Sequence, residues 1–353
     1  MNICIFTNTL LSGGAEKQAV LLAKVLNEKY NIFLVIYYGE KVEHKYLEIV
    51  KNNHIKTIYL YGNHLKRIFN LYKFLRREKI DIIFSYLLTT NFLGGLIGKI
   101  AGVEYTIGGI RNSQISKKKL IIQRFLHNSI NYKTIYNNFC GVEQLSKLGF
   151  KREKSIVIPN CYELTEDPVH RPSKKNVVVL SVGRFYKSKD YYTAIKSIAI
   201  LKKSFQDLEY YIIGYGILEN KVNEWIRYFN ASDYIKVIIN PDNLEHYYKM
   251  ANIYLQTSLY EGLSNAIMEA MSFSLPLVVT RVGDNDKLVI NGENGYLCTP
   301  KDSEKFAVCL LELCNSPELR EKFGQKSYQI LKYNYSLDKF KQQYIDFIES
   351  LKK

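Results

Sequence analysis

Short apolar runs typical of β-strands alternate with helix-periodic segments along this chain, and the alternation begins twice. The first series opens with the run 3–7, the glycine turn 12–14 and the helical segment 15–26. A second series opens with the apolar run 177–182, after the polar, charged stretch 163–175. Repeated strand–helix units with short connections predict parallel sheets covered by helices. We therefore predict an α/β fold with two Rossmann-like, doubly wound parallel-sheet domains facing each other across a cleft.

The stretch 163–175, with its two prolines, marks the boundary between these domains. Residues 1–163 are predicted to form the N-terminal domain and residues 164–335 the C-terminal domain. Further strands are predicted at 32–37, 56–60, 81–86, 104–107, 155–158, 210–213, 253–256 and 277–279. Ligands of open parallel sheets bind beyond the carboxyl ends of the strands, so we expect the active site in the cleft between the domains.

The net charge of +15 is unevenly distributed. Residues 1–160 hold 24 Lys and Arg against 10 Asp and Glu, whereas residues 161–353 hold 25 against 24. A strongly basic half points to an anionic partner, either a nucleic acid or an anionic membrane surface.

The composition indicates a globular chain in a reducing compartment. Hydrophobic residues make up 47% and charged residues 24%, which excludes a disordered chain. The six cysteines form no C-x-x-C pair, and a chain of 353 residues does not need disulfides. The first residues lack the features of a secretory signal, and the longest uncharged stretch, 82–98, is too polar for a membrane span. We expect a soluble cytoplasmic protein.

Two glycine-containing turns follow predicted strands and could hold phosphate. In the first, Gly14 lets the backbone approach an anion at the start of a helix, although many such turns are only tight connections. In the second, Gly183 is followed by Arg184 and, five residues later, by Lys189. Two cations on a ligand-facing loop suit a diphosphate, whereas the alternative is a solvated basic loop.

A third motif contains two glutamates, Glu261 and Glu269, on either side of a helix start near Ser264. Backbone amides at the helix start would bind an anion, and the Glu269 carboxylate would accept hydrogen bonds from a ribose diol. The alternative is that both glutamates are surface residues flanking the helix.

Together these motifs resemble glycosyltransferase family four, whose members have the GT-B fold. The matching segments, in chain order, are Gly13-Gly14-Ala15-Glu16, Ile158-Pro159-Asn160, Val182-Gly183-Arg184 with Lys189, Ile213-Gly214-Tyr215-Gly216, the Glu-x₇-Glu segment 261–269, and the segments 276–280 and 291–295. The resemblance covers nearly the whole chain. It implies a retaining, metal-independent transfer of a sugar from a nucleotide diphosphate donor, without a cofactor.

The resemblance also implies a role for each residue. Arg184 and Lys189 would stabilise the leaving diphosphate, which is where charge develops in the reaction. Glu261 would contact donor-sugar hydroxyls near the reacting carbon, and Glu269 the ribose. The remaining nucleotide-sugar site would comprise Gly14, Gly183, Gly214, Gly262, Leu263, Ser264 and Asn265. The segment 336–353 is expected to form a helix that returns to the N-terminal domain.

Two segments depart from the family pattern, and both bear on donor identity. Residues 283–287, Gly-Asp-Asn-Asp-Lys, stand where the family usually has a glycine pair and a glutamate, and residues 239–241 lack a glycine. UDP is the expected nucleotide and GDP the alternative.

Other polar residues are weaker candidates. Asp284 and Asp286 form a D-x-D, but it lies too far along the second half to favour a metal site, so we expect no metal. The histidines show no ligand spacing, and among them only His127 is a candidate for contact with the donor sugar. Arg111 and Asn112 follow a predicted strand and are candidate contacts to donor or acceptor.

The function predicted is a retaining hexosyltransferase of cell-envelope polysaccharide biosynthesis, such as capsule, O-antigen or lipopolysaccharide assembly. Its expected partners are a nucleotide-sugar donor, with a UDP-sugar as the expected one, and a saccharide or polyprenyl-linked saccharide acceptor. The alternatives are a UDP-sugar 2-epimerase of the same fold and a non-enzymatic polyanion-binding protein.

The basic half contains two segments, 65–77 and 117–126, that alternate cations with Leu, Ile and Phe. This composition is typical of helices that lie in a lipid headgroup layer, although most such helices pack on a sheet. No nucleic-acid-binding module is recognisable. We therefore expect peripheral association with the inner, anionic face of the cell membrane and no nucleic-acid partner.

Overall fold

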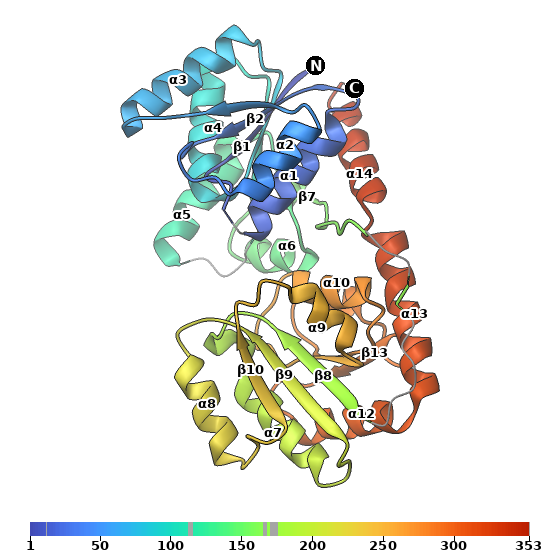
Figure 1. Cartoon of the computed structure of the whole chain (residues 1–353). Coiled ribbons are helices and arrows are strands. Elements are labelled where there is room, and N and C mark those ends of the chain that lie inside the picture. Colours follow the sequence, from blue (N-terminus) through green and yellow to red (C-terminus); the bar gives the residue numbers. More distant parts are fainter. Residues whose placement is uncertain (12, 112–115, 165–167, 170–175, 353) are drawn as a thin grey trace. The chain divides into compact units, whose positions relative to one another are not determined.

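The computed structural model describes residues 1–11, 13–111, 116–164, 168–169 and 176–352, which form two compact units (Figure 1). Unit 1 comprises Met1–Cys161 and Leu337–Lys353, and unit 2 comprises Tyr162–Ser336. The boundaries predicted from the sequence, 163/164 and 335/336, lie within two residues of these changeovers.

Unit 1 is built on a seven-stranded parallel sheet with the order β3-β2-β1-β4-β5-β6-β7. Its strands are β1 (Asn2–Thr7), β2 (Asn31–Ile36), β3 (Lys56–Tyr59), β4 (Ile82–Ser85), β5 (Tyr105–Ile110), β6 (Lys133–Tyr136) and β7 (Ser155–Val157). Its helices are α1 (Gly14–Leu26), α2 (His44–Asn52), α3 (His64–Arg77), α4 (Leu87–Ala101), α5 (Lys117–Phe125), α6 (Phe139–Ser146) and α14 (Leu337–Ser350). A π-helical turn, η1 (Leu126–Ile130), continues α5, and a 3₁₀ turn, η2 (Arg152–Lys154), precedes β7.

The two faces of this sheet bury different helices because successive strand residues point to opposite sides. Ile3 and Ile5 of β1 pack in one core with residues of α1, α2 and α14. Cys4 and Phe6 of the same strand pack in a second core with residues of α3 and α4. The continuous apolar character of the strands therefore follows from burial on both faces.

The last helix, α14, belongs to unit 1. Its Tyr344 and Phe347 rings lie 5.5 and 6.2 Å from the ring of Phe84 in β4. At the end of the helix, Glu349 accepts a hydrogen bond of 2.7 Å from the Tyr30 hydroxyl. The segment after 336 thus completes the core on one face of the unit 1 sheet.

Unit 2 is built on a six-stranded parallel sheet with the order β10-β9-β8-β11-β12-β13. Its strands are β8 (Val177–Val182), β9 (Leu208–Gly214), β10 (Ile235–Ile239), β11 (Ile253–Gln256), β12 (Leu277–Thr280) and β13 (Gly295–Cys298). Its helices are α7 (Tyr191–Lys202), α8 (Glu219–Tyr228), α9 (Leu244–Met250), α10 (Asn265–Ser272), α11 (Asn285–Leu288), α12 (Ser303–Asn315) and α13 (Pro317–Asn334), with a 3₁₀ turn η3 (Lys187–Lys189). Helices α7, α8 and α12 contribute to one core and α9, α10 and α13 to the other.

Both sheets reverse their strand order once, between β1 and β4 in unit 1 and between β8 and β11 in unit 2. Such a reversal separates the loops at the carboxyl ends of two neighbouring strands, and ligands of doubly wound folds bind there. The prediction of two doubly wound parallel-sheet α/β domains is confirmed, and the reversals show where in each unit a site is expected.

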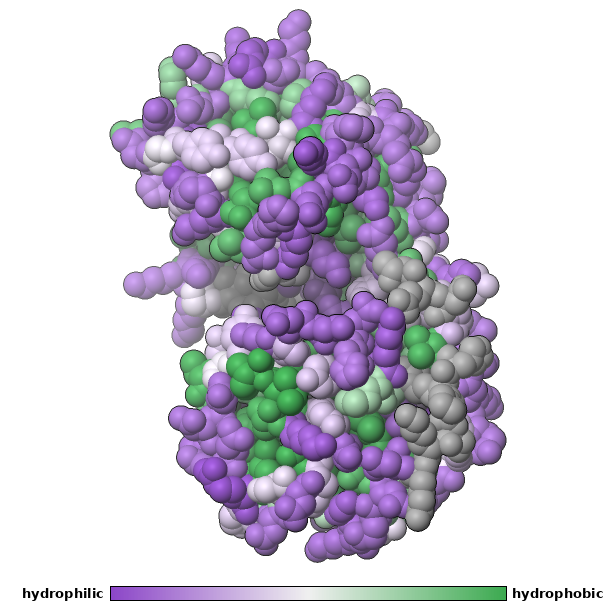
Figure 2. Space-filling model, in the orientation of Figure 1, coloured by the Kyte–Doolittle hydropathy of each residue, from purple (hydrophilic) through white to green (hydrophobic). Residues whose placement is uncertain are grey.

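Hydrophilic side chains cover most of the face of both units seen in Figure 2, with small hydrophobic areas between them. Within the described ranges, no helix combines the length and the apolar character that a bilayer span requires.

Candidate active site

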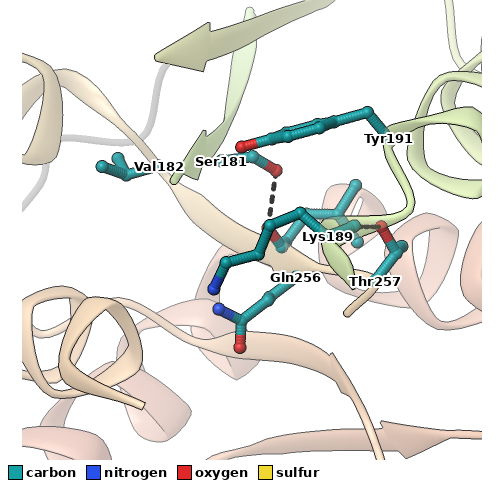
Figure 3. Close-up of a pocket in the computed structure, with 7 residues that line it drawn as sticks. Ser181, Val182, Lys189, Tyr191, Gln256 and Thr257 are labelled. Carbon is teal, nitrogen blue, oxygen red and sulfur yellow. Dashed lines mark hydrogen bonds between the residues drawn. The ribbon is translucent and has the colours of Figure 1, made fainter. Parts of the chain in front are cut away.

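A small pocket opens at the reversal point of the unit 2 sheet. It lies at the carboxyl ends of β8 and β11, which are paired neighbours. The residues that line it are Ser181, Val182, Lys189, Tyr191, Leu255, Gln256 and Thr257 (Figure 3). Lys189 is a predicted catalytic residue, and Val182 belongs to the family-like segment 182–184.

Hydrogen bonds from the loop after β11 to backbone carbonyl oxygens hold the loop after β8 in place. The Thr257 hydroxyl donates to the carbonyl oxygens of Lys189 and Asp190 at 3.1 and 2.9 Å. The Leu259 N–H donates to the carbonyl oxygen of Ser188 at 2.7 Å. The turn that carries Lys189 is therefore held by the neighbouring strand's loop.

Lys189 and Glu261, 72 residues apart, form an ion pair in this loop cluster. Lys189 Nζ lies 2.5 Å from Glu261 Oε1, and the Ser258 hydroxyl donates to the same oxygen at 2.6 Å. The two charged side chains are only 21% and 12% exposed, so solvent screens their attraction less than at an open surface. No described residue hydrogen-bonds the second carboxylate oxygen, Oε2, which is left to accept from a ligand hydroxyl.

Gly283 packs closely against the backbone of the loop that carries Glu261. Its φ is +55°, and a Cβ added there would lie 2.2 Å from the carbonyl oxygen of Glu261. The next residue, Asp284, donates its backbone N–H to the carbonyl oxygen of Gly262 at 3.2 Å. The segment 283–287, which departs from the family pattern, thus packs against the backbone of the glutamate motif.

The same segment places its two aspartates differently. Asp284 is buried, whereas Asp286 is exposed on α11. In the described part of the chain, no three His, Cys, Asp or Glu side chains gather in a group that could hold a metal ion.

Helix α10 begins without a side-chain cap. The Ser264 hydroxyl, which would ordinarily cap it, instead accepts a hydrogen bond of 3.2 Å from Gln256 Nε2. The positive end of the helix is therefore available to an anion through its backbone amides. Leu263 is buried and joins the apolar core, so only its backbone, together with that of Gly262, faces such a ligand.

Glu269 lies on α10, and its Oε2 accepts a hydrogen bond of 3.0 Å from the Tyr248 hydroxyl of α9. Burial is the main cause that raises the pKa of Tyr248, and the negative charge of Glu269 raises it further. Tyr248 therefore remains a neutral donor that orients the carboxylate.

The remaining unit 2 candidates lie around the end of β8. Arg184 is exposed, and its guanidinium carbon is 5.2 Å from the ring centroid of Tyr186, so it does not line the pocket. Gly214 has a φ of +157°, and a Cβ there would lie 2.0 Å from the carbonyl oxygen of Gly183. Gly214 is thus required by close backbone approach, whereas a Cβ on Gly183 would meet only the Tyr191 hydroxyl, at 3.2 Å, and the Lys189 side chain.

The candidate site residues of unit 1 lie on different elements. Gly14 is the first residue of α1, which also begins without a side-chain cap. His127 is fully buried, its Nε2 lies 2.9 Å from the carbonyl oxygen of Lys151, and burial lowers the pKa of its imidazole. This burial argues against a contact between His127 and a sugar. Arg111 is partly buried after β5, and Asn112 lies outside the described residues.

Sequence reasoning missed several polar residues of the site: Ser258, Gln256, Thr257 and Tyr248. A usable signal existed for the first three, because a polar run directly follows the apolar residues of β11. Tyr248 carried no such signal, since only the packing of α9 beside α10 brings it to Glu269.

Comparison with known proteins places this geometry in context. The family model described as "Glycosyl transferases group 1" matches residues 164–330, within unit 2. An uncharacterized glycosyltransferase of Haemophilus influenzae is 30% identical over 192 residues, and the match spans 54% of this chain and 54% of that protein. The chain thus spans about half the length of that relative.

Two further relatives match over more of their length. A UDP-Gal:alpha-D-GlcNAc-diphosphoundecaprenol alpha-1,3-galactosyltransferase of Escherichia coli is 24% identical over 313 residues, with 80% of each chain covered. A GalNAc-alpha-(1->4)-GalNAc-alpha-(1->3)-diNAcBac-PP-undecaprenol alpha-1,4-N-acetyl-D-galactosaminyltransferase of Campylobacter jejuni is 24% identical, covering 100% of this chain and 99% of that protein.

Among solved structures, Anabaena HepE in complex with UDP is similar with a TM-score of 0.85, at 16% identity, over 99% of this chain and 100% of that chain. The lipopolysaccharide outer core galactosyltransferase WaaB has a TM-score of 0.79 at 18% identity, with 99% of both chains covered. The predicted GT-B fold is confirmed. The comparisons support a glycosyltransferase.

The packing of Gly283 leads to a first prediction. Replacement Gly283→Ala will destabilise unit 2 by about 1–3 kcal/mol and lower its enzymatic activity, because the new methyl group displaces the Glu261 backbone. Gly292→Ala is the matched control, since Gly292 also has a positive φ, +82°, but nothing within 4 Å of its added Cβ. Thermal unfolding and activity assays of both variants check this. Equal losses in the two would contradict the role of close backbone contact.

Proposed function

We propose that this chain is a retaining, metal-independent hexosyltransferase of cell-envelope polysaccharide assembly. It moves a sugar from a nucleotide diphosphate, most simply UDP, to a saccharide acceptor carried on a lipid. Unit 2 binds the donor, and unit 1 binds the acceptor.

The observation that carries this proposal is the Lys189–Glu261 ion pair at the reversal point of the unit 2 sheet. It brings a cation suited to phosphate, which lines the pocket, into contact with a carboxylate suited to sugar hydroxyls, in the loop that leads to the uncapped start of α10. The match of the group 1 glycosyltransferase model to residues 164–330 supports the same conclusion.

The reaction breaks the bond between the anomeric carbon and the diphosphate oxygen and forms a bond from that carbon to an acceptor hydroxyl. The hydroxyl proton passes to the departing phosphate oxygen. Negative charge develops on the leaving diphosphate, so fixed cations there accelerate the step. Lys189 has three N–H donors, so it can keep its bond to Glu261 and still donate to phosphate. Arg184 supplies the second cation by turning from Tyr186.

Donor binding is assigned to the remaining motif residues. Glu269, oriented by Tyr248, accepts from the ribose hydroxyls, and the free Oε2 of Glu261 accepts from the donor sugar. UDP is favoured because the similar HepE structure holds UDP. A lipid-linked acceptor is favoured because the Escherichia coli and Campylobacter jejuni relatives are named for undecaprenol-linked substrates.

A panel of nucleotide sugars, with and without a short prenyl-diphosphate saccharide acceptor, tests this function. We expect acceptor-dependent release of the nucleotide diphosphate with retention at the anomeric carbon, and undiminished rates in excess chelator. Isomerisation of a UDP-sugar without acceptor would instead establish a 2-epimerase. Loss of activity in chelator that manganese or magnesium restores would contradict metal independence.

Variants of the two assigned binding groups should separate turnover from affinity. Lys189→Ala will lower kcat by about 10²-fold, since it removes a contact that strengthens as the phosphate charge develops. Glu269→Ala will mainly raise the donor KM, because ribose contacts are made equally in the ground state. Lys187→Ala, an exposed lysine in the same 3₁₀ turn, is the control and should behave as wild type. Full activity of Lys189→Ala would refute its assignment.

The basic half of the chain motivates a proposal on location. Helix α3 packs Leu71, Phe74 and Leu75 on the sheet, although its Leu65 and Phe69 side chains are 79% and 54% exposed. Helix α5 differs in that it buries no apolar side chain, and its Ile121, Ile122 and Phe125 are 63%, 44% and 54% exposed. Three consecutive exposed lysines, Lys117, Lys118 and Lys119, lie at its start. We propose that α5 attaches the protein to the anionic inner face of the cell membrane.

Sedimentation with vesicles checks this location. Binding should require anionic lipid, decrease at high salt, and be lost in the triple variant Lys117→Glu, Lys118→Glu, Lys119→Glu, since each lysine near the surface contributes about 1 kcal/mol. Phe125→Ser should weaken binding through its apolar contact alone. Lys66→Glu with Lys73→Glu, both exposed on α3, is the control expected to retain most binding. Equal binding to neutral vesicles would contradict the proposal.

A further inference from the structure

Arg111 is a cation surrounded by neutral groups at the carboxyl edge of the unit 1 sheet. It directly follows β5, and its guanidinium carbon lies 4.5 Å from the ring centroid of Tyr86, which directly follows the paired strand β4. Its Nη1 donates a hydrogen bond of 2.9 Å to Asn160 Oδ1, beyond β7. The hydroxyl of Tyr344, from α14, also faces it.

None of these groups balances the charge of Arg111. Burial raises the pKa of Tyr86 and of Tyr344, so both phenols stay neutral at physiological pH. No carboxylate in the described ranges lies within ion-pair distance of the guanidinium, and its buried Nε has no hydrogen-bond partner there. A partly buried charge without a counter-ion or a full set of acceptors is costly, and an anionic ligand would remove that cost.

Two other arginines in the described ranges, Arg67 and Arg320, are buried, and both are satisfied internally. Arg67 bonds both carboxylate oxygens of Glu40, at 3.0 and 3.1 Å, and two carbonyl oxygens. Arg320 donates to the carbonyl oxygens of Leu313 and Cys314. Arg111 thus differs from both in having an unsatisfied buried donor at the edge of a parallel sheet where ligands bind.

We propose that Arg111 binds an oxyanion of the acceptor, either the diphosphate of a lipid-linked saccharide or the carboxylate of an acidic sugar. Stacking on Tyr86 and the bond to Asn160 hold the guanidinium plane, and its remaining N–H donors form the fork that phosphate and carboxylate oxygens fit. The inference rests on the proposed function, since it assigns the acceptor to unit 1. If Arg111 binds an oxyanion, a good acceptor must carry a negative charge.

Calorimetric titration of the full chain tests this without relying on turnover. The protein is first saturated with UDP, which occupies the donor site, and is then titrated with geranyl diphosphate, with galacturonate, and with geraniol and galactose as neutral counterparts. We expect one of the two anions, and neither neutral compound, to bind wild type. Arg111→Gln should weaken that binding at least about tenfold, and Arg111→Lys should restore part of it. UDP affinity should be the same in all three proteins.

The outcomes separate this inference from the proposed function. Binding of geranyl diphosphate identifies the diphosphate as the source of the oxyanion, and binding of galacturonate identifies the acidic sugar. Equal anion affinity in wild type and Arg111→Gln overturns the inference, as does a loss of UDP affinity in the variant, which would place Arg111 at the donor. Failure of wild type to bind any nucleotide diphosphate would count against the proposed function instead.

Discussion

The Lys189–Glu261 ion pair is the interaction on which the candidate site depends. It joins the loop after β8 to the loop after β11. The Thr257 hydroxyl and the Leu259 N–H, which donate to carbonyl oxygens of the first loop, hold the same two loops together. The pair can form because β8 and β11 are neighbours at the reversal of strand order, where their loops leave the sheet at one edge. A charge pair shielded from solvent is costly to break by removing one partner, so a ligand is better accommodated by the spare donors of Lys189 and the free oxygen of Glu261.

Close backbone contacts determine how these loops are placed. Gly214 meets the carbonyl oxygen of Gly183, and Gly283 meets that of Glu261, at separations that any side chain would prevent. The sequence marks Gly214 through a family motif, whereas Gly283 stands in the segment that departs from the family pattern. Its structural position explains why a glycine is required there in spite of the departure, and it connects the strand β12 loop to the glutamate motif.

The basic charge of the first half is used in three physically different ways. Arg67 is internal and is neutralised by Glu40. The lysines at the start of α5 are exposed beside uncovered apolar side chains. Arg111 lies between these extremes, shielded but with no counter-ion among the residues that the structure describes. A count of charges predicts an anionic partner, but only the surroundings of each cation distinguish a structural ion pair from a surface that attracts lipid or a group that binds substrate.

The sequence by itself determined the two parallel-sheet domains and the linear motifs, because strands buried on both faces need continuous apolar runs and phosphate-binding turns need glycine. It did not predict β6, β10 or β13. Two of these, β10 and β13, are edge strands. The short β13, Gly-Tyr-Leu-Cys, gives a weak apolar signal, whereas β10, Ile-Lys-Val-Ile-Ile, has a β-branched run that was overlooked. The sequence also did not predict which side chains contact the motif residues. Ser258 donates to Glu261, Tyr248 donates to Glu269, and the ring of Tyr86 lies against Arg111. Spacing along the chain fixes which residues share a turn, whereas the strand order and the packing of helices decide which turns meet, and the tertiary structure alone contains that information.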